Sequence, residues 1–239
     1  MSMFGAEYGV PGAVLAPGRL LVARCVVKDD EMPKQVYLIR HGETEGTLAG
    51  RVMGSTDLPL AAQGRDHVQR LAELLQPRLL TSGAGTWCVA SPLLRARQTA
   101  EVVAGCLGLP VSTDADLREI DFGAWEGLTS AEVEERFPGA QARLASPQDD
   151  AGFPGGESLC EFDRRVGRAL DRILGHPAQT ALVFAHGGVI RSLACALLGL
   201  GQERLWLLNV QPASVMRIDL FDGGAMLSEL WAASDRGAD

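Results

Sequence analysis

The chain has 239 residues, of which 46% are hydrophobic, and it carries a formal net charge of −8 at pH 7. This length and composition suffice for one substantial hydrophobic core, and α/β folds of this size commonly form a single domain. The acidic balance argues against nucleic acid or an anionic membrane surface as the main binding partner, so an anionic substrate would need a locally basic pocket.

Residues 1–34 form an N-terminal extension of uncertain structure, ahead of a domain at residues 35–239. Proline and arginine residues interrupt the apolar stretches of this extension, and no basic region precedes them, which argues against a secretory signal peptide. Two interpretations stay open: Arg19–Val27 forms an additional strand, or translation begins at Met32.

The sequence from residue 35 onward alternates strand-like and helix-like segments. Apolar runs typical of strands fall at about 35–40, 86–90, 110–113, 182–185, 213–220 and 225–230. Helical periodicity or helix-start signals mark residues 64–80, 92–107, 129–137, 159–174 and 189–198. This alternation predicts an α/β fold, a three-layer α/β/α sandwich with a mainly parallel sheet and helices on both faces.

Side-chain caps are expected at two of the helix starts. Ser91 followed by Pro92 fits an N-cap and the first helical residue. Ser158 and Glu161 have the spacing of a capping box. The first of these caps would place Arg95 in the first turn of its helix.

The cysteines indicate a reduced, cytoplasmic protein. Five of them are spread widely within apolar runs, at positions 25, 88, 106, 160 and 195. The sequence contains no Cys or His spacing typical of a zinc site, so we expect no metal and no cofactor. Its apolar runs are all shorter than the roughly 20 residues of a membrane span, so no membrane partner is expected either.

Two histidines each follow an apolar, strand-like run and precede a glycine. His41 and Gly42 end the first run, and His186 and Gly187 end the run near the C-terminus. In open α/β sheets, ligands bind outside the carboxyl ends of the strands, so the two histidines can meet in one site despite their distance in sequence. A single histidine in this position is more often structural, but a pair with Arg40 directly before the first favours chemistry.

An ordered set of motifs resembles the histidine phosphatase superfamily, which has the phosphoglycerate mutase-like fold. The motifs are Arg40-His41-Gly42-Glu43-Thr44, the segment from Ser91 to Ala100, Glu119 within Leu-Arg-Glu-Ile-Asp-Phe-Gly, Gly156-Glu157-Ser158, and His186-Gly187. The resemblance covers about residues 35–232. Within this superfamily, the sequence is most similar to the branch of bacterial α-ribazole phosphatases and broad-specificity phosphatases.

The residues themselves offer the parts that phosphoryl transfer requires: a nucleophile, positive charge for the phosphoryl oxygens and a proton for the leaving oxygen. A neutral imidazole at His41 can attack phosphorus and hold the phosphoryl group covalently. Arg40 favours the neutral ring by like-charge repulsion and supplies planar donors for phosphate oxygens. Arg95, in the first turn of its helix, can face the same anion together with the helix N-terminus.

The resemblance implies roles for further residues. His186 would donate to the phosphoryl oxygens with the backbone N–H of Gly187. Glu119 would be the general acid and base, although Asp121 and Glu126 are rivals on sequence alone. Thr47 stands where many members have an asparagine and would replace it through its hydroxyl.

Glu157 has two interpretations, since it either borders the pocket or stabilises the dipole of the helix that follows.

Three functions are compared on this basis. The first is a metal-independent phosphomonoesterase that hydrolyses a small phosphorylated metabolite through a phosphohistidine. The second is a cofactor-dependent phosphoglycerate mutase, and the third is a noncatalytic binding relative. The short segment between Gly127 and Glu157 should leave a phosphohistidine open to water, which favours hydrolysis, and the complete set of motif residues argues against the noncatalytic relative.

A wall of Phe122, Trp125 and Phe153 would suit an aromatic leaving group such as that of α-ribazole 5′-phosphate in cobalamin synthesis. Whether the protein forms a homodimer is left open.

Overall fold

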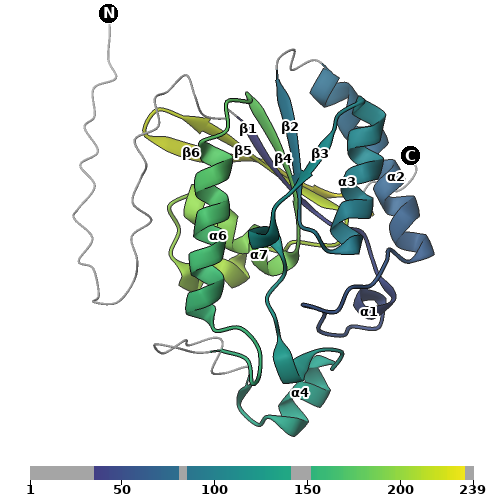
Figure 1. The fold of residues 1–239 in the computed structure, drawn as a ribbon, viewed down its shortest axis with the longest axis vertical. Coiled ribbons are helices and arrows are strands. Elements are labelled where there is room, and N and C mark those ends of the chain that lie inside the picture. The colour runs from purple at the N-terminus through teal and green to yellow at the C-terminus, as the bar shows by residue number, and fades with distance from the viewer. Residues whose placement is uncertain (1–34, 81–84, 141–151, 235–239) are drawn as a thin grey trace, which may run out of the picture.

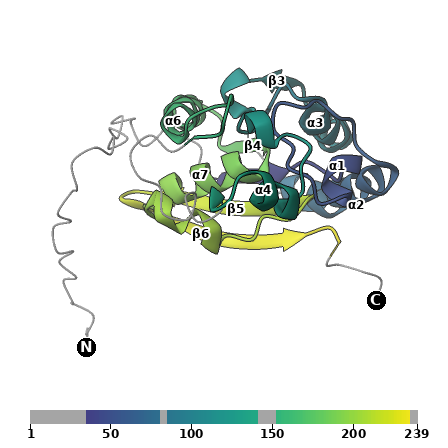
Figure 2. The ribbon, with the colours of Figure 1, turned by 90° about the horizontal axis from the view of Figure 1, so that it is seen from below.

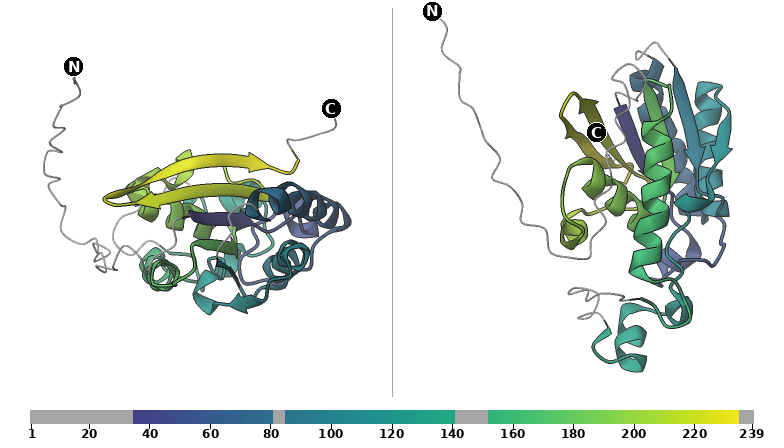
Figure 3. Two further views of the ribbon diagram at one scale, coloured as in Figure 1. Left: turned by 90° about the horizontal axis from the view of Figure 1, so that it is seen from above. Right: turned by 60° about the vertical axis from the view of Figure 1, so that its left-hand side comes forward.

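The computed structural model describes residues 35–80, 85–140 and 152–234 and places a six-stranded sheet at their centre (Figure 1). The strands are β1 (Gln35–Arg40), β2 (Thr86–Ala90), β3 (Val111–Thr113), β4 (Thr180–Ala185), β5 (Ser214–Phe221) and β6 (Gly224–Ala232). Their order across the sheet is β3-β2-β4-β1-β5-β6. The four strands from β3 to β1 pair in parallel, while β5 runs antiparallel to both β1 and β6. The predicted mainly parallel sheet is confirmed, with an antiparallel hairpin along one edge (Figure 3).

Helices cover both faces of this sheet. The α-helices are α1 (Glu45–Leu48), α2 (Ala62–Leu80), α3 (Leu94–Leu107), α4 (Ser130–Arg136), α6 (Leu159–Leu174) and α7 (Gly187–Leu197). The short 3-10 helices are η2 (Ala115–Leu117), η3 (Gly123–Trp125) and η4 (Gln202–Leu207). Figure 2 shows α2 and α3 grouped on one side of the molecule and α6 and α7 on the other.

The two faces of the sheet bury two separate apolar clusters. On β1, Val36 and Leu38 pack against α6 and α7, and Tyr37 and Ile39 pack with α2 and α3. Successive side chains of a strand point to opposite faces, so a central strand covered on both sides reads as a continuous apolar run. This burial explains why the first strand could be predicted from its composition, and it confirms the three-layer α/β/α sandwich.

The start of α3 differs from the prediction. The helix begins at Leu94, its N-cap is Leu93, and no side chain of the N-cap residue caps it. Instead, the Leu94 N–H donates to Oδ1 of Asp57 at 2.6 Å, from a loop that precedes α2. Ser91 as N-cap and Pro92 as the first helical residue were therefore wrong, because a segment distant in sequence supplies the acceptor.

The other local predictions of helix starts come close to the structure. The Ser158–Glu161 capping box is present at the start of α6, whereas α7 begins at Gly187, two residues before its predicted start. Of the described cysteines, Cys88 and Cys195 are buried, but Cys160 is exposed and so does not belong to the core.

Two further observations concern the described residues alone. They contain no helix long and apolar enough to cross a membrane. They also contain no group of three or more His, Cys, Asp or Glu side chains arranged to hold a metal ion. The N-terminal extension, with its two interpretations, lies outside the described residues.

Candidate active site

The topology brings the two histidines together at the carboxyl edge of the sheet. His41 follows β1 and His186 follows β4, and these strands pair in parallel with Arg40 beside Ala185. The His41 N–H donates to the carbonyl of Ala185 at 3.1 Å. The two imidazole rings lie 5.1 Å apart between centroids, tilted by 59°. Because β1 and β4 are neighbouring parallel strands, the two histidines that follow them lie close together, as expected from their positions at strand ends.

The hydrogen bonds of His41 define which ring nitrogen is free to react. Nδ1 lies 2.7 Å from the carbonyl oxygen of Gly42, and because a carbonyl only accepts, Nδ1 carries the proton. Nε2 accepts a hydrogen bond from Nε of Arg95 at 3.2 Å. Burial, together with the charges of Arg40 and Arg95, holds the pKa of His41 well below its ordinary value. His41 is therefore a neutral imidazole with its lone pair on Nε2.

The two buried neutral histidines predict a pH-dependent stability. Burial also holds the pKa of His186 well below the ordinary value of 6.5, so below pH 6.5 the unfolded chain binds more protons than the folded chain. We expect these groups to leave the free energy of unfolding unchanged above about pH 7 and to lower it as the pH falls, by up to about 1.4 kcal/mol per pH unit and histidine. Urea unfolding between about pH 7.5 and pH 5 measures this slope.

The variant His41→Asn provides the comparison, since it removes one of the two titrating groups. Its free energy of unfolding should fall less steeply over the acid range than that of the wild type. Equal slopes would show that His41 takes up a proton as readily in the folded state as in the unfolded state.

Arg95 joins the site from the first turn of α3 and is fully buried. Besides His41, its guanidinium donates to the carbonyls of Gly54 and Thr56, each at 2.8 Å. Thr99, one turn further, donates its hydroxyl to the Arg95 carbonyl and accepts the N–H of Gly42, which ties the helix to the loop after His41. Arg95 lies where the sequence predicts, but the accompanying N-terminus of α3 faces Asp57 and not the site.

Two buried nitrogens beside the site have no partner among the described residues: Nε of Arg40, and Nδ1 of His186, which is a donor in the tautomer whose Nε2 accepts from the Ser91 hydroxyl. The rest of each side chain is held, Arg40 by the carbonyl of Val210 at 2.7 Å and Nε2 of His186 by the hydroxyl of Ser91 at 2.8 Å. Burial lowers the pKa of Arg40 to about 10, so it stays charged at neutral pH. Buried polar atoms are nearly always paired, so these two atoms indicate a site for a bound anion.

The N-terminus of α7 adds partial positive charge at the same place. Gly187 is its first residue, and a Cβ there would lie 3.6 Å from Cζ of Arg40. Helix N-termini bind anions through their free N–H groups and the helix dipole. The backbone N–H of Gly187, which is expected to donate to phosphoryl oxygens, belongs to this helix N-terminus.

Glu119 faces the same helix N-terminus. Its Oε2 atom accepts the N–H of Gly188 at 3.1 Å, and its Oε1 atom accepts the N–H of Ile120 at 3.1 Å. A Cβ on Gly188 would lie 2.6 Å from Oε1 of Glu119, so a side chain there would displace the carboxylate. The charge of Glu119 raises the pKa of both Arg40 and Arg95 against the larger, opposite effect of burial.

The two rival carboxylates are engaged in loop structure. Asp121 accepts the N–H of Gly123 at 3.0 Å. Glu126 accepts the N–H groups of Gly54 and Ser55 at 2.9 and 3.0 Å. These contacts favour Glu119 as the carboxylate of the site.

The hydroxyl of Thr47 makes its hydrogen bonds within its own helical turn. It accepts the N–H of Thr44 at 2.8 Å and donates to the Thr44 carbonyl at 2.9 Å, as part of a capping box on α1. Both roles of the hydroxyl are filled within this turn, so the geometry does not support Thr47 as a phosphate ligand.

The three rings of the predicted aromatic wall pack against one another. Trp125 and Phe153 are buried and pack edge to face, with ring centroids 5.0 Å apart, and Phe122 packs edge to face on Phe153. Trp125 and Phe153 belong to a core cluster, against which the partly buried Phe122 packs, so they offer little exposed aromatic surface.

The structure adds two residues that sequence reasoning did not assign to the site. Ser91, taken as a helix cap, contacts His186. Arg191 lies one turn after Gly187 on α7, and its Nε donates to the carbonyl of Leu208 at 2.9 Å. Its guanidinium lies over the ring of Trp206, 5.3 Å from the centroid, and that ring is 66% exposed. The four-residue spacing from Gly187 is the signal that could have identified Arg191.

Several known proteins are similar to this chain in sequence and in fold. The chain is 33% identical over 204 residues to the probable phosphoglycerate mutase GpmB of Salmonella paratyphi C, covering 85% of this chain and 92% of that protein. It resembles the crystal structure of a putative α-ribazole-5′-P phosphatase from Escherichia coli with a TM-score of 0.74 and 29% identity, over 84% of this chain and 97% of that one.

A mycobacterial glucosyl-3-phosphoglycerate phosphatase, solved with VO3, matches with a TM-score of 0.71 and 28% identity, over 83% of this chain and 99% of that one. Residues 36–232 match the profile of the histidine phosphatase superfamily, branch 1. On the shared sequence, fold and motifs, the chain belongs to the histidine phosphatase superfamily.

Proposed function

We propose that the protein is a phosphomonoesterase that transfers the phosphoryl group of a small metabolite to His41 and then to water, without a metal ion. The observation that carries this proposal is the unprotonated Nε2 of His41 beside two buried, unpartnered nitrogens, Nε of Arg40 and Nδ1 of His186. Such an arrangement pairs a nucleophile with groups that compensate the charge on phosphoryl oxygens.

In the first step, Nε2 of His41 forms a bond to phosphorus while the ester P–O bond breaks. Glu119 enters this step protonated and gives its proton to the departing oxygen, which leaves as an alcohol, so that Glu119 becomes a carboxylate. In the second step, a water oxygen attacks phosphorus and Glu119 takes a proton from that water. The N–P bond breaks, which releases inorganic phosphate and restores neutral His41.

Positive charge for both transition states comes from the chain itself. Arg40 and Arg191 lie at the N-terminus of α7, and Arg95 contacts His41. Burial lowers the pKa of all three guanidinium groups, and the negative charge of Glu119 opposes this effect. Three guanidinium groups and a helix N-terminus supply the electrostatic compensation that many phosphatases obtain from divalent cations. This supports catalysis without a metal ion.

We propose α-ribazole 5′-phosphate as the substrate, ahead of other small phosphate esters. The likeness to the putative α-ribazole-5′-P phosphatase of Escherichia coli supports this choice. The exposed ring of Trp206, beside Arg191, offers the aromatic surface that Trp125 and Phe153 do not. The identity with the GpmB relatives makes phosphoglycerate mutase the second candidate.

A substrate panel on the purified protein separates these functions. The protein is incubated separately with α-ribazole 5′-phosphate, with 3-phosphoglycerate plus 2,3-bisphosphoglycerate, and with sugar and nucleoside monophosphates, and both free phosphate and 2-phosphoglycerate are measured. We expect the highest kcat/KM for phosphate release from α-ribazole 5′-phosphate. In the variant Trp206→Ala, the ratio of this kcat/KM to that for the other phosphate esters should be smaller. Rapid formation of 2-phosphoglycerate would establish a mutase, and equal, slow hydrolysis of every ester would establish a broad-specificity phosphatase.

A further inference from the structure

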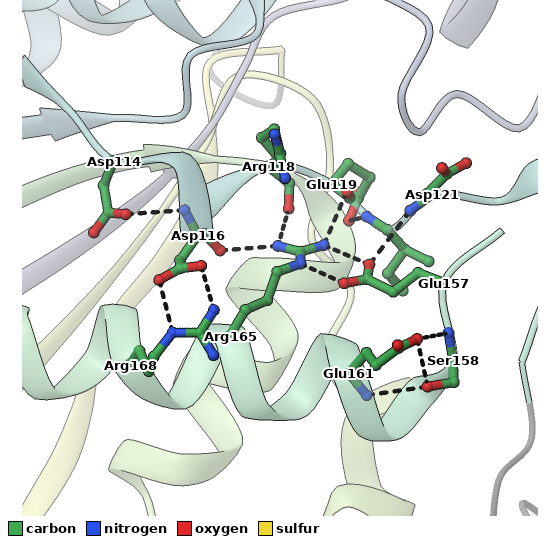
Figure 4. A network of polar contacts seen from close by, with 11 residues as sticks. Asp114, Asp116, Arg118, Glu119, Asp121, Glu157, Ser158, Glu161, Arg165 and Arg168 are labelled. Carbon is green, nitrogen blue, oxygen red and sulfur yellow. Dashed lines mark hydrogen bonds and ion pairs between the residues drawn. The ribbon is translucent and has the colours of Figure 1, made fainter.

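Arg165 on α6 uses every N–H of its guanidinium within the protein. It is only 6% exposed and makes its hydrogen bonds to Glu157 and to the loop that carries Glu119 (Figure 4). We propose that Arg165, with Glu157 as its counter-charge, is a positioning residue for Glu119. This inference rests on the proposed role of Glu119 as general acid and base.

Three of the hydrogen bonds hold the backbone of the Glu119 loop. Nη1 of Arg165 donates to the carbonyls of Asp116 and Arg118 at 2.8 and 2.6 Å, and Nη2 donates to the carbonyl of Glu119 itself at 3.0 Å. A guanidinium is planar and its donors have fixed directions, so three carbonyls bound to one group are fixed relative to each other.

The Glu119 loop depends on this contact because it lies outside regular secondary structure. Residues 118–122 fall between η2 and η3, where neither a sheet ladder nor a helix fixes the backbone. The side chain of Glu119 is held from the opposite direction, by the N–H of Gly188 on α7. Arg165 and α7 therefore clamp the residue at its backbone and at its carboxylate.

Glu157 offsets the free-energy cost of burying the charged guanidinium of Arg165. Its Oε1 and Oε2 atoms accept from Nε and Nη2 of Arg165 at 2.6 and 2.7 Å, a bidentate pair. A buried guanidinium without a counter-charge would be costly. The Glu157 N–H also donates to the carbonyl of Asp121 at 2.9 Å, so the same residue ties the far side of the loop. This pairing gives Glu157 a role that differs from both interpretations of the sequence.

A neighbouring arginine on α6, Arg168, forms an ion pair that does not involve residues 118–121 of the Glu119 loop. Arg168 pairs with the side chain of Asp116 at 2.7 Å, with its own side chain 52% exposed, and it makes no hydrogen bond to the carbonyls of residues 118–121. Exposed pairs of this kind contribute little to stability. Arg168→Gln is therefore a matched control for Arg165→Gln, on the same helix and with the same change of charge.

The test uses two aryl phosphates of similar size whose leaving groups differ in their need for a proton. The p-nitrophenolate anion leaves readily without one, whereas 4-methylphenolate depends on the general acid. The measured quantity is the ratio of kcat/KM for p-nitrophenyl phosphate to that for 4-methylphenyl phosphate, which reports on phosphorylation of His41. Glu119→Gln should raise this ratio by about 10²-fold, because general acid catalysis contributes that much or more.

Arg165→Gln should raise the same ratio by about tenfold or more, since a displacement of about 1 Å is costly for a catalytic group. Arg168→Gln should leave the ratio at the wild-type value. In the Glu119→Gln background, Arg165→Gln should raise the ratio no further. Arg165→Lys keeps the charge beside Glu157 but donates from one nitrogen only, so it should raise the ratio in the same direction, and it serves as the test if the Gln variant does not fold.

The outcomes separate the inference from the function on which it rests. If Glu119→Gln leaves the ratio unchanged, Glu119 is not the general acid and the proposed function fails at that residue. The inference is overturned if Glu119→Gln raises the ratio but the folded Arg165 variants do not. In that case the kcat/KM values for the two aryl phosphates fall equally or stay unchanged, and Arg165 has only a structural role.

Discussion

Replacing His41 by alanine is expected to abolish turnover, with a loss of at least about 10³-fold in kcat/KM. His41 combines a neutral ring, an unprotonated Nε2 that accepts from the Arg95 side chain, and a backbone hydrogen bond to the neighbouring strand β4. In the wild type, rapid quench with a labelled phosphomonoester should trap an acid-labile, base-stable phosphoenzyme. The label should be absent from the His41→Ala variant.

His176→Ala is the matched control for this experiment. His176 stacks on Trp87 with ring centroids 4.0 Å apart, remote from the strand ends that carry His41 and His186, so its loss should leave turnover unchanged. Label found on His186, or full activity in His41→Ala, would contradict the assignment of the nucleophile.

The second large effect is expected at Arg95. The variant Arg95→Ala should lose about 10²–10³-fold in kcat, as is typical when a preorganised donor to the developing charge is removed. The guanidinium donates to the nucleophilic nitrogen of His41 and is held in place by the carbonyls of Gly54 and Thr56. Added guanidinium ion should restore part of the activity, because it can replace the missing charge.

Arg97→Ala provides the comparison on the same helix, since Arg97 is exposed. Its kcat should match that of the wild type. The thermal unfolding midpoint of both variants distinguishes loss of charge from loss of the fold. An Arg95→Ala protein that folds and turns over at the wild-type rate would rule out the proposed part of this arginine in phosphoryl transfer.

Much of the fold and several site residues could be predicted because their signals are local. An apolar run followed by His-Gly marks a strand end wherever it occurs, so the positions of His41 and His186 followed from the sequence. The capping box at Ser158 is equally local, since all its hydrogen bonds lie within one helical turn. A local box on α1 also occupies Thr47, and its Thr-x-x-Thr spacing was a signal that the resemblance to the family obscured.

The long-range partners of the polar and aromatic side chains could not be predicted from the sequence. Asp57, 37 residues before Leu94, accepts the N–H of that first residue of α3, and the Ser91 hydroxyl contacts both the N–H of Leu93 and His186. Arg165 reaches carbonyls 46 to 49 residues away, and no periodicity marks that contact.

Most strands and helices, and the place of two histidines at strand ends, could be predicted from the sequence, because these properties depend on hydrophobic period and nearest neighbours. The burial of Trp125, the exposure of Trp206 beside Arg191 and the contact of Glu119 with the N-terminus of α7 depend on the three-dimensional packing. The physical reason is that such pairings are set by the packing of segments distant in the chain, which local propensity does not encode.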